Sequence, residues 1–401
     1  MSDSQNDLKY TFSNVLINNK KPCLINFSSK WDNKDVPTPK SVIYSLIDNG
    51  YNCSKFKLFD RNIEVLKTMK FFNKKALVGF NNWELTTIIN DNNFAKNEIR
   101  KLLPYKDVID TFIVANEPLG AWYNNEFTYL LNPALKIISN TLKELMPNKK
   151  ITIPHNFAIF VNTYPPSNSI IDSNYENILD ESINIIKNHS NDSIMMINIY
   201  PYLTYEQNIN IIDINFALGI KSLSRVYDDK YIYNSLFTLM YDSAYVAFQK
   251  KNYNIPIEIG EVGWPNNGGI EANTENECEA LHQLQIDTIV GTPRNPGPIN
   301  IYLFEAIDEP WKDIGPGLFE THWGIINSDL TPKCNYLKLP LLESTNNNYK
   351  YLFLPFIPLL FCLFSCLYFK IRTNKYKTIN SKIKLTHNFN NKKYNSILTK
   401  I

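Results

Sequence analysis

The stretch TFIVANEPLGAWYNNEFTYLLNPALKIISNTLKEL, residues 111–145, contains a strand pattern followed by a helix pattern. Residues 111–115, TFIVA, form a short apolar run, which is typical of a strand covered on both faces. Asn132 and Pro133 precede an amphipathic run, with the asparagine as a helix cap and the proline at the first helical position. We therefore predict a buried strand followed by the helix that covers it.

Similar apolar runs occur along most of the chain. Together with residues 111–115, these runs predict eight strands. They lie at 24–27, 56–59, 76–79, 111–115, 151–153, 193–199, 256–260 and 299–304. Helical patterns between them include 38–47, where Thr38 and Pro39 form the expected cap, 132–145, 178–186, 234–248 and 275–289. Strands alternating with helices predict a (β/α)₈ TIM barrel, with a doubly wound open sheet as the alternative. No G-x-G-x-x-G follows the first strand, which argues against a dinucleotide-binding version of that sheet.

Composition and charge exclude some classes of protein. Hydrophobic residues make up 44% and charged residues 20% of the 401, which rules out wholesale disorder. Residues 370–401 contain nine of the 41 Lys and Arg and no Asp or Glu, so residues 1–369 hold 32 basic against 39 acidic side chains. This acidic balance argues against nucleic acid as a partner.

The C-terminal part of the sequence has the pattern of a membrane anchor. A polar linker at 341–350 precedes residues 351–369, which carry no charge and would span roughly 28 Å as a helix. We expect these residues to cross the lipid bilayer once, with a buried helix at the base of the barrel as the alternative. The basic tail at 370–401 is expected to be disordered and cytosolic, which would place the barrel outside the cell or in a lumen.

The N-terminal segment, residues 1–22, is polar and shows no apolar core of a signal peptide. The catalytic barrel is expected to occupy residues 23–340. Cys23, Cys53, Cys278 and Cys334 are expected to be buried thiols, and no C-x-x-C pair lies near a histidine pair. We therefore expect no metal and no organic cofactor.

Two glutamates follow expected strands at the barrel end that holds active sites. Glu117 follows the fourth strand, directly after Asn116, and Glu261 follows the seventh, directly after Gly260, whose small size would let a substrate approach. Such a pair meets the need of glycoside hydrolysis for one protonated and one ionised carboxyl group. Glu258, three residues before Glu261, is expected to face the helix layer.

Ten short motifs occur in a fixed order from residue 25 to residue 324. They are INF at 25–27, VPTPKSV at 36–42, KLFD at 57–60, VANEP at 114–118, NPAL at 132–135, NIYPY at 198–202, GEVGWP at 260–265, YLF at 302–304, DEPWK at 308–312 and PGLFETHWG at 316–324. In this order they resemble glycoside hydrolase family 17, the β-1,3-glucanases, and its plant-type, membrane-anchored branch in particular. Leu24, Ser28 and Phe59 depart from residues common in the family, which bears on substrate preference rather than on the carboxylates.

The resemblance implies roles for particular residues. Glu117 would be the acid/base, Glu261 the nucleophile, and Asn116 would bind the 2-hydroxyl of the sugar. Supporting charges would come from Glu309, Lys312 and Glu320, with Lys312 beside Glu261 to keep it ionised. Flat rings bind the apolar faces of sugars, and the aromatic side chains that we expect in the cleft are Tyr200, Tyr202 and Trp264.

The expected activity is retaining hydrolysis of internal β-1,3-glucosidic bonds by a monomer. A β-1,3-glucan transglycosylase would use the same carboxylates, since a second glucan would replace water. A membrane-anchored glucan-binding protein without turnover is the alternative from another class. The presence of both Glu117 and Glu261 argues against it.

Overall fold

The computed structural model describes residues 21–28, 36–91, 93–220 and 224–334. The expected polar linker, membrane-spanning segment and basic tail at 341–350, 351–369 and 370–401 lie outside these residues. No helix within the described ranges is both long enough and apolar enough to cross a membrane.

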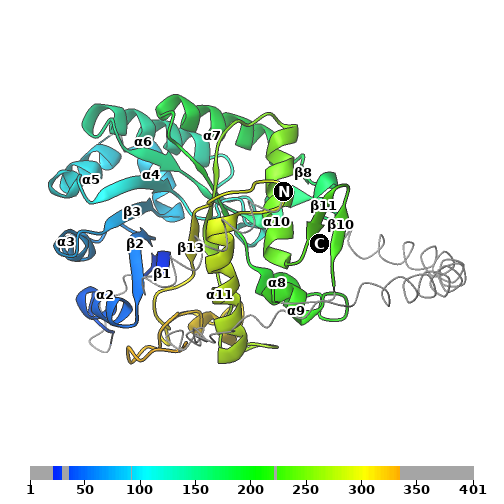
Figure 1. Cartoon of the computed structure of the whole chain (residues 1–401). Coiled ribbons are helices and arrows are strands. Elements are labelled where there is room, and N and C mark those ends of the chain that lie inside the picture. The colour runs from blue at the N-terminus through cyan, green and yellow to red at the C-terminus, as the bar shows by residue number, and fades with distance from the viewer. Residues whose placement is uncertain (1–20, 29–35, 92, 221–223, 335–401) are drawn as a thin grey trace, which may run out of the picture. The chain divides into compact units, whose positions relative to one another are not determined.

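The nine strands of the main sheet form a nearly closed parallel barrel (Figure 1). Their order is β5-β4-β3-β2-β1-β13-β12-β9-β6. The bounds are β1 (Lys21–Phe27), β2 (Tyr51–Leu58), β3 (Lys75–Phe80), β4 (Ile109–Val114), β5 (Lys150–Thr152), β6 (Pro154–Asn156), β9 (Met195–Asn198), β12 (Ile257–Val262) and β13 (Ile301–Leu303). Only Ile153 separates β5, which pairs with β4, from β6, which pairs with β9, so the two ends of the sheet meet at one stretch of chain. The predicted strands are confirmed, and the open sheet is excluded.

Helices alternate with these strands and surround them (Figure 1). They are α2 (Pro39–Asp48), α3 (Ile63–Phe71), α4 (Leu85–Asn90), α5 (Phe94–Leu102), α6 (Leu131–Leu145), α7 (Glu176–His189), α8 (Pro201–Glu206), α9 (Ile214–Leu218), α10 (Leu236–Lys250) and α11 (Thr274–Val290). Two small antiparallel pairs lie outside the barrel sheet, β7 (Phe160–Val161) with β8 (Ile170–Ile171) and β10 (Val226–Asp228) with β11 (Tyr231–Tyr233).

The two expected helix caps have different outcomes. Thr38 caps α2 as predicted, because its Oγ1 accepts a hydrogen bond from the backbone N–H of Ser41 at 3.2 Å. Helix α6 instead begins at Leu131, so Asn132 lies inside the helix. The Asn132 amide donates to the carbonyl of Ile178 at 3.0 Å and therefore joins α6 to α7.

The expectation of four buried thiols is wrong. Cys23 and Cys53 form one disulfide, and Cys278 and Cys334 form another. The first pair follows from the sheet register, since Cys23 of β1 lies directly opposite Cys53 of β2.

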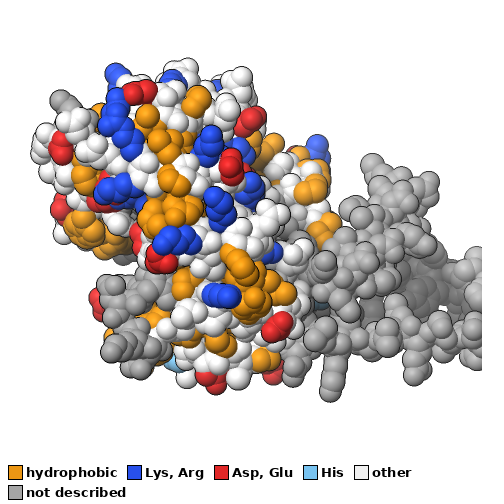
Figure 2. Space-filling model, turned by 90° about the vertical axis from the view of Figure 1, so that its left-hand side faces the viewer, with side chains coloured by type: hydrophobic (Ala, Val, Ile, Leu, Met, Phe, Trp, Pro, Cys, Tyr) orange, Lys and Arg blue, Asp and Glu red, His pale blue; other side chains and the backbone are white. Residues whose placement is uncertain are grey.

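The outer helices present a mixed surface. Figure 2 shows lysine and arginine side chains interspersed with apolar ones on the side that carries α2, α3 and α5. Lys40 lies over the exposed rings of Tyr44 and Phe71, with its Nζ 5.8 and 5.0 Å from their centroids. These rings are therefore partly covered by a cation from the same face.

The barrel interior contains both apolar and charged side chains. An apolar cluster is formed by Leu77, Ile113, Ile194, Met196 and Tyr302. Glu258 is the second residue of β12 and accepts a hydrogen bond from Asn300 at 2.6 Å. Its charge interacts with those of Lys55 in β2 and Lys150, the first residue of β5. Glu258 therefore lies at the N-terminal end of the barrel, and the expectation that it faces the helices is wrong. The β12 register shifts after Ile259, so the usual alternation does not separate Glu258 from Glu261.

Candidate active site

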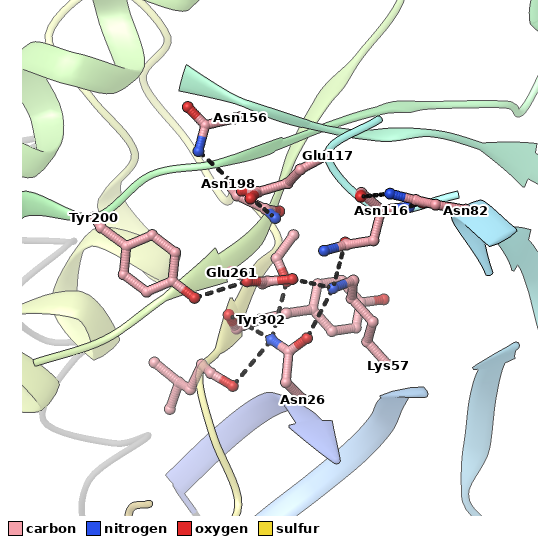
Figure 3. A network of polar contacts seen from close by, with 12 residues as sticks. Asn26, Lys57, Asn82, Asn116, Glu117, Asn156, Asn198, Tyr200, Glu261 and Tyr302 are labelled. Carbon is pink, nitrogen blue, oxygen red and sulfur yellow. Dashed lines mark hydrogen bonds and ion pairs between the residues drawn. The ribbon is translucent and has the colours of Figure 1, made fainter. Parts of the chain in front are cut away.

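Glu261 is a buried carboxylate with a donor on each oxygen (Figure 3). It is the second-last residue of β12, and the Nζ of Lys57 lies 2.6 Å from its Oε1. The hydroxyl of Tyr200 donates to its Oε2 at 2.7 Å. Both contacts fix the direction of the carboxylate.

Lys57 is fully buried in β2 and joins three side chains at the barrel mouth. Besides Glu261, its Nζ donates to Asn26 Oδ1 at 3.0 Å and to Asn116 Oδ1 at 3.3 Å. Burial lowers the pKa of Lys57, and the negative charge of Glu261 opposes that shift. Lys57 belongs to the KLFD motif, but no role was predicted for it. Its position between Phe56 and Leu58 in an apolar run was a usable signal of a buried, functional lysine.

The structure therefore corrects the expected partner of Glu261. Lys312 was expected beside it, but its ion pairs are with Glu305 at 3.2 Å and Glu320 at 3.7 Å. Glu309, which lies between Glu305 and Lys312 in the sequence, is buried. Glu305, which the sequence analysis did not single out, is also buried, and burial raises its pKa well above the ordinary value while Lys312 opposes the shift.

Glu117 follows β4 in an unusual backbone conformation. Ala115 has a φ of 65° and Glu117 a φ of 50°. Residues other than glycine rarely adopt this backbone region, and those that do are frequently at functional sites. The backbone N–H of Glu117 donates to the carbonyl of Pro154 at 2.8 Å. Its Oε1 accepts from the amides of Asn156 at 3.1 Å and Asn198 at 2.9 Å, at the ends of β6 and β9.

The surroundings of Glu117 favour a protonated carboxyl group. Burial raises the pKa of Glu117 to about 7, and the negative charge of Glu261 acts in the same direction. The two amides and Lys57 oppose the shift. Glu117 can therefore give a proton near neutral pH, whereas Glu261, in contact with Lys57, is placed to act without one.

Two further residues set the geometry of this pair. Asn82 holds Asn116 by two bonds, since its Oδ1 accepts from the Asn116 backbone at 2.7 Å and its amide donates to the Asn116 carbonyl at 2.9 Å. A Cβ at Gly260 would lie 2.5 Å from Asn198 Oδ1. Gly260 thus makes room for the amide that binds Glu117, rather than for substrate as expected.

The three aromatic residues expected in the cleft have different positions. Tyr200 contacts Glu261 directly, as described above. Tyr202 and Trp264 are only 0% and 1% exposed, and their rings pack against each other with centroids 5.1 Å apart. The expectation that these two rings face sugar is therefore wrong in this structure, because both are enclosed. Phe319 and Trp323 also pack against the ring of Tyr202, and Tyr205 packs against that of Trp264.

The arrangement supplies one acid, one carboxylate paired with a cation, and neutral amides bonded to the acid. Within the described ranges, no three His, Cys, Asp or Glu side chains form a group that could hold a metal ion. The chemistry that these residues can perform themselves is acid-assisted displacement at a carbon bearing an oxygen leaving group.

Comparisons with known proteins agree with this chemistry. The family model "Glycosyl hydrolases family 17" matches residues 25–336. Glucan endo-1,3-beta-glucosidase 8 of Arabidopsis thaliana is 30% identical over 344 residues, which are 82% of this chain and 69% of that relative. Glucan endo-1,3-beta-glucosidase 5 of the same plant is 30% identical over 308 residues, 74% of this chain and 62% of that relative.

A solved structure is also similar. CJP38, described as a β-1,3-glucanase and allergen of Cryptomeria japonica pollen, superposes with a TM-score of 0.71 at 27% identity. The match covers 78% of this chain and 97% of that one.

Proposed function

The chain belongs to glycosyl hydrolase family 17, and from this membership we propose that it hydrolyses internal β-1,3-glucosidic bonds of glucans with retention of configuration. The proposal rests on one observation, the different surroundings of the two carboxyl groups. Glu117 has a pKa of about 7, and Glu261 is in a buried ion pair with Lys57. Retaining glycosidases need one carboxyl group of each kind.

In the first step, Glu261 attacks the anomeric carbon and forms a covalent bond to it. The bond from that carbon to the leaving glucan oxygen breaks, and the proton of Glu117 goes to this oxygen. Lys57 and Tyr200 hold the Glu261 carboxylate in place before the attack, with contacts of 2.6 and 2.7 Å. The orientation is therefore set before substrate arrives.

In the second step, Glu117 has lost its proton and acts as a base. It takes a proton from water, whose oxygen attacks the anomeric carbon and breaks the bond to Glu261. The amides of Asn156 and Asn198 can donate to the ionised form of Glu117 at this stage. The second inversion restores the original configuration.

Digestion of laminarin, a soluble β-1,3-glucan, tests this function. Short oligosaccharides whose new reducing ends first appear as β-anomers by NMR are the expected result. Unchanged polymer, or new ends that first appear as α-anomers, would contradict the proposal. Products longer than the starting chains would show that a second glucan replaces water, which is transglycosylation.

We further propose that residues 351–369 anchor the chain in a bilayer, with the barrel outside the cell or in a lumen. The uncharged run and the basic residues after it support the anchor. The two disulfides in the barrel support an oxidising compartment. Protease added to intact cells should digest the barrel and spare an epitope at residue 401, and the opposite pattern would reverse the orientation.

The glucan site requires one copy of the chain, because Glu117, Glu261 and their partners all come from it. We accordingly propose that the enzyme acts as a monomer. Light scattering of the detergent-solubilised protein at the concentrations used for the activity assay tests this.

A further inference from the structure

A cavity of about 120 Å³ adjoins the catalytic residues at the ends of β2, β3 and β4. Lys57 and Asn116, which contact each other beside Glu261, form one part of its lining. Asn82, Trp83 and Tyr123 form another part. The cavity is therefore continuous with the site of bond cleavage.

Large aromatic rings lie at the surface beside this cavity. Trp83 is 65% exposed and Trp122 is 56% exposed. Tyr123 lies between them, with its ring centroid 5.9 Å from that of Trp83 and 5.7 Å from that of Trp122. We call Trp83, Trp122 and Tyr123 the aromatic shelf. Phe127 is buried against Trp83 and Tyr123, with centroid distances of 5.0 and 4.9 Å, and supports the shelf from within.

The backbone on either side of Trp83 is held firmly although its ring is exposed. Trp83 lies in the 3-10 helix Asn82–Glu84, and Asn82 is bonded to Asn116 as described above. Glu84 accepts from Arg61 at 2.9 and 2.5 Å and from the backbone of Asn81 at 2.7 Å. A rigid, exposed tryptophan beside a catalytic site loses little conformational freedom when a ligand covers it.

The other side of the shelf is held by close packing. A Cβ at Gly120 would lie 2.4 Å from Cζ2 of the Trp122 ring, so the ring rests directly on this glycine. The backbone N–H of Gly120 donates to the carbonyl of Glu117 at 2.9 Å. The position of Trp122 is thus tied to that of the catalytic acid.

The position of the shelf indicates which half of a substrate it would contact. Asn156 and Asn198 donate to Glu117 Oε1 from the ends of β6 and β9, so the Glu117 carboxyl lies on that side of the site. Because Glu117 gives its proton to the leaving oxygen, we infer that the leaving group lies on the same side. Figure 3 shows Asn82 and Asn116 on one side of the pair of glutamates and Tyr200 on the other. The cavity and the shelf share the side of Asn82 and Asn116, away from the leaving group.

We propose that the aromatic shelf binds the glucosyl residues on the non-reducing side of the bond that is cleaved, beyond the residue attacked by Glu261. The indole of Trp83 would stack on the apolar C–H face of one sugar ring, while the amide side chains of the cavity meet its hydroxyl groups. The proposal rests on the proposed function, because its ligand is a β-1,3-linked glucan.

Trp83→Ala tests the shelf, with Tyr227→Ala as the matched control. Tyr227 is 67% exposed, close to the exposure of Trp83, and lies in β10, outside the catalytic machinery. The full-length chain would be assayed on laminarihexaose labelled at its reducing end. Trp83→Ala should lower kcat/KM about tenfold, equivalent to about 1.4 kcal/mol, with a smaller change in kcat. Trp83→Phe should recover most of the loss.

The labelled products show which side of the bond the shelf contacts. With weaker binding on the non-reducing side, Trp83→Ala should move cleavage toward the non-reducing end. A shift toward the reducing end, or kinetics and products equal to those of Tyr227→Ala, would overturn the proposal. Failure of the hydrolase function would appear separately, as an inert wild type. In that event, calorimetric titration with laminarihexaose still tests the shelf, since Trp83→Ala should weaken binding and equal affinity would overturn the proposal.

Discussion

Lys57 and Glu261, 204 residues apart in the sequence, form a buried ion pair with Nζ 2.6 Å from Oε1. The cation comes from β2 and the carboxylate from β12, which are separated in the sheet by β1 and β13. The side chains therefore meet inside the barrel mouth rather than along a strand pair. Both side chains are buried, so loss of either partner would leave the other charge buried without its counter-charge.

Replacement of Lys57 by methionine should abolish most of the activity. Methionine has a similar length but no charge, so Glu261 would be left as a buried carboxylate without its cation. We expect kcat on laminarin to fall at least about a hundredfold.

Lys67→Met is the matched control. Lys67 also lies 2.6 Å from a carboxylate, that of Glu64, but both side chains are more than half exposed. Exposed pairs contribute only about 0–1 kcal/mol, so the control should keep wild-type activity and stability. Equal activity of the two variants would refute the role of Lys57.

The positions of the two glutamates could be predicted from the sequence because strand ends in a parallel barrel converge at one mouth. Their partners could not. Lys57 and Asn198 were visible in motifs, but no local pattern indicates which distant side chain each one meets. The same limit applies to the two disulfides, whose cysteines are 30 and 56 residues apart in the sequence.

Which aromatic rings near the active site are exposed was harder to predict than which lie near it. Tyr202 and Trp264 lie next to the active site in sequence, and sequence reasoning placed both in the cleft. Their rings instead form a second layer beneath it, while the exposed rings of Trp83 and Trp122 come from segments after β3 and β4. Aromatic residues are common in both layers, so residue type alone does not separate them.

The two carboxyl groups should respond differently to substitution by glutamine. Glu261→Gln removes the nucleophile, so cleavage of laminarin and of an aryl β-glucoside should both fall by several orders of magnitude. Glu117→Gln removes the acid of the first step and the base of the second. The first step on the aryl substrate, whose leaving group needs no proton, should therefore be much less affected than the first step on laminarin. Near-normal turnover of laminarin by Glu261→Gln would exclude the assigned mechanism.

The activity should decline as the pH rises through about 7. Glu117 must carry a proton in the first step, and its pKa is about 7. The alkaline limb of kcat/KM against pH reports this ionisation in the free enzyme. In Asn156→Ala, an amide that donates to the Glu117 carboxylate is lost, so the pKa should rise and the alkaline limb should move to higher pH. A limb that stays in place or moves to lower pH would show that another group controls it.

The hydroxyl of Tyr200 should matter more than its ring. Tyr200→Phe keeps the packing but removes the 2.7 Å hydrogen bond to Glu261. Hydrogen bonds to charged groups contribute about 1.5–3 kcal/mol, so kcat should fall about ten- to a hundredfold. Tyr253→Phe is the control, because it removes a hydroxyl bonded to Asp180 instead. Equal kcat values for the two variants would exclude orientation of Glu261 by Tyr200.

Glu117 should make the barrel less stable as the pH rises. Its pKa is about 7 in the folded protein against an ordinary value of 4.5, so the folded state holds this proton more tightly than the unfolded state. Below pH 4.5 both states are protonated and the group has no effect on the pH dependence. Between about 4.5 and about 7 the unfolded state loses its proton first, and the free energy of unfolding therefore falls with pH.

Glu117→Gln removes this ionisation and should raise stability relative to wild type more at pH 8 than at pH 4. Urea unfolding of both proteins at the two pH values measures the difference. Glu126→Gln, on the exposed surface, corrects for the altered net charge. If Glu117→Gln changes the free energy of unfolding equally at both pH values, Glu117 binds its proton no more tightly in the folded barrel than in the unfolded chain, and its assignment as the acid loses its physical basis.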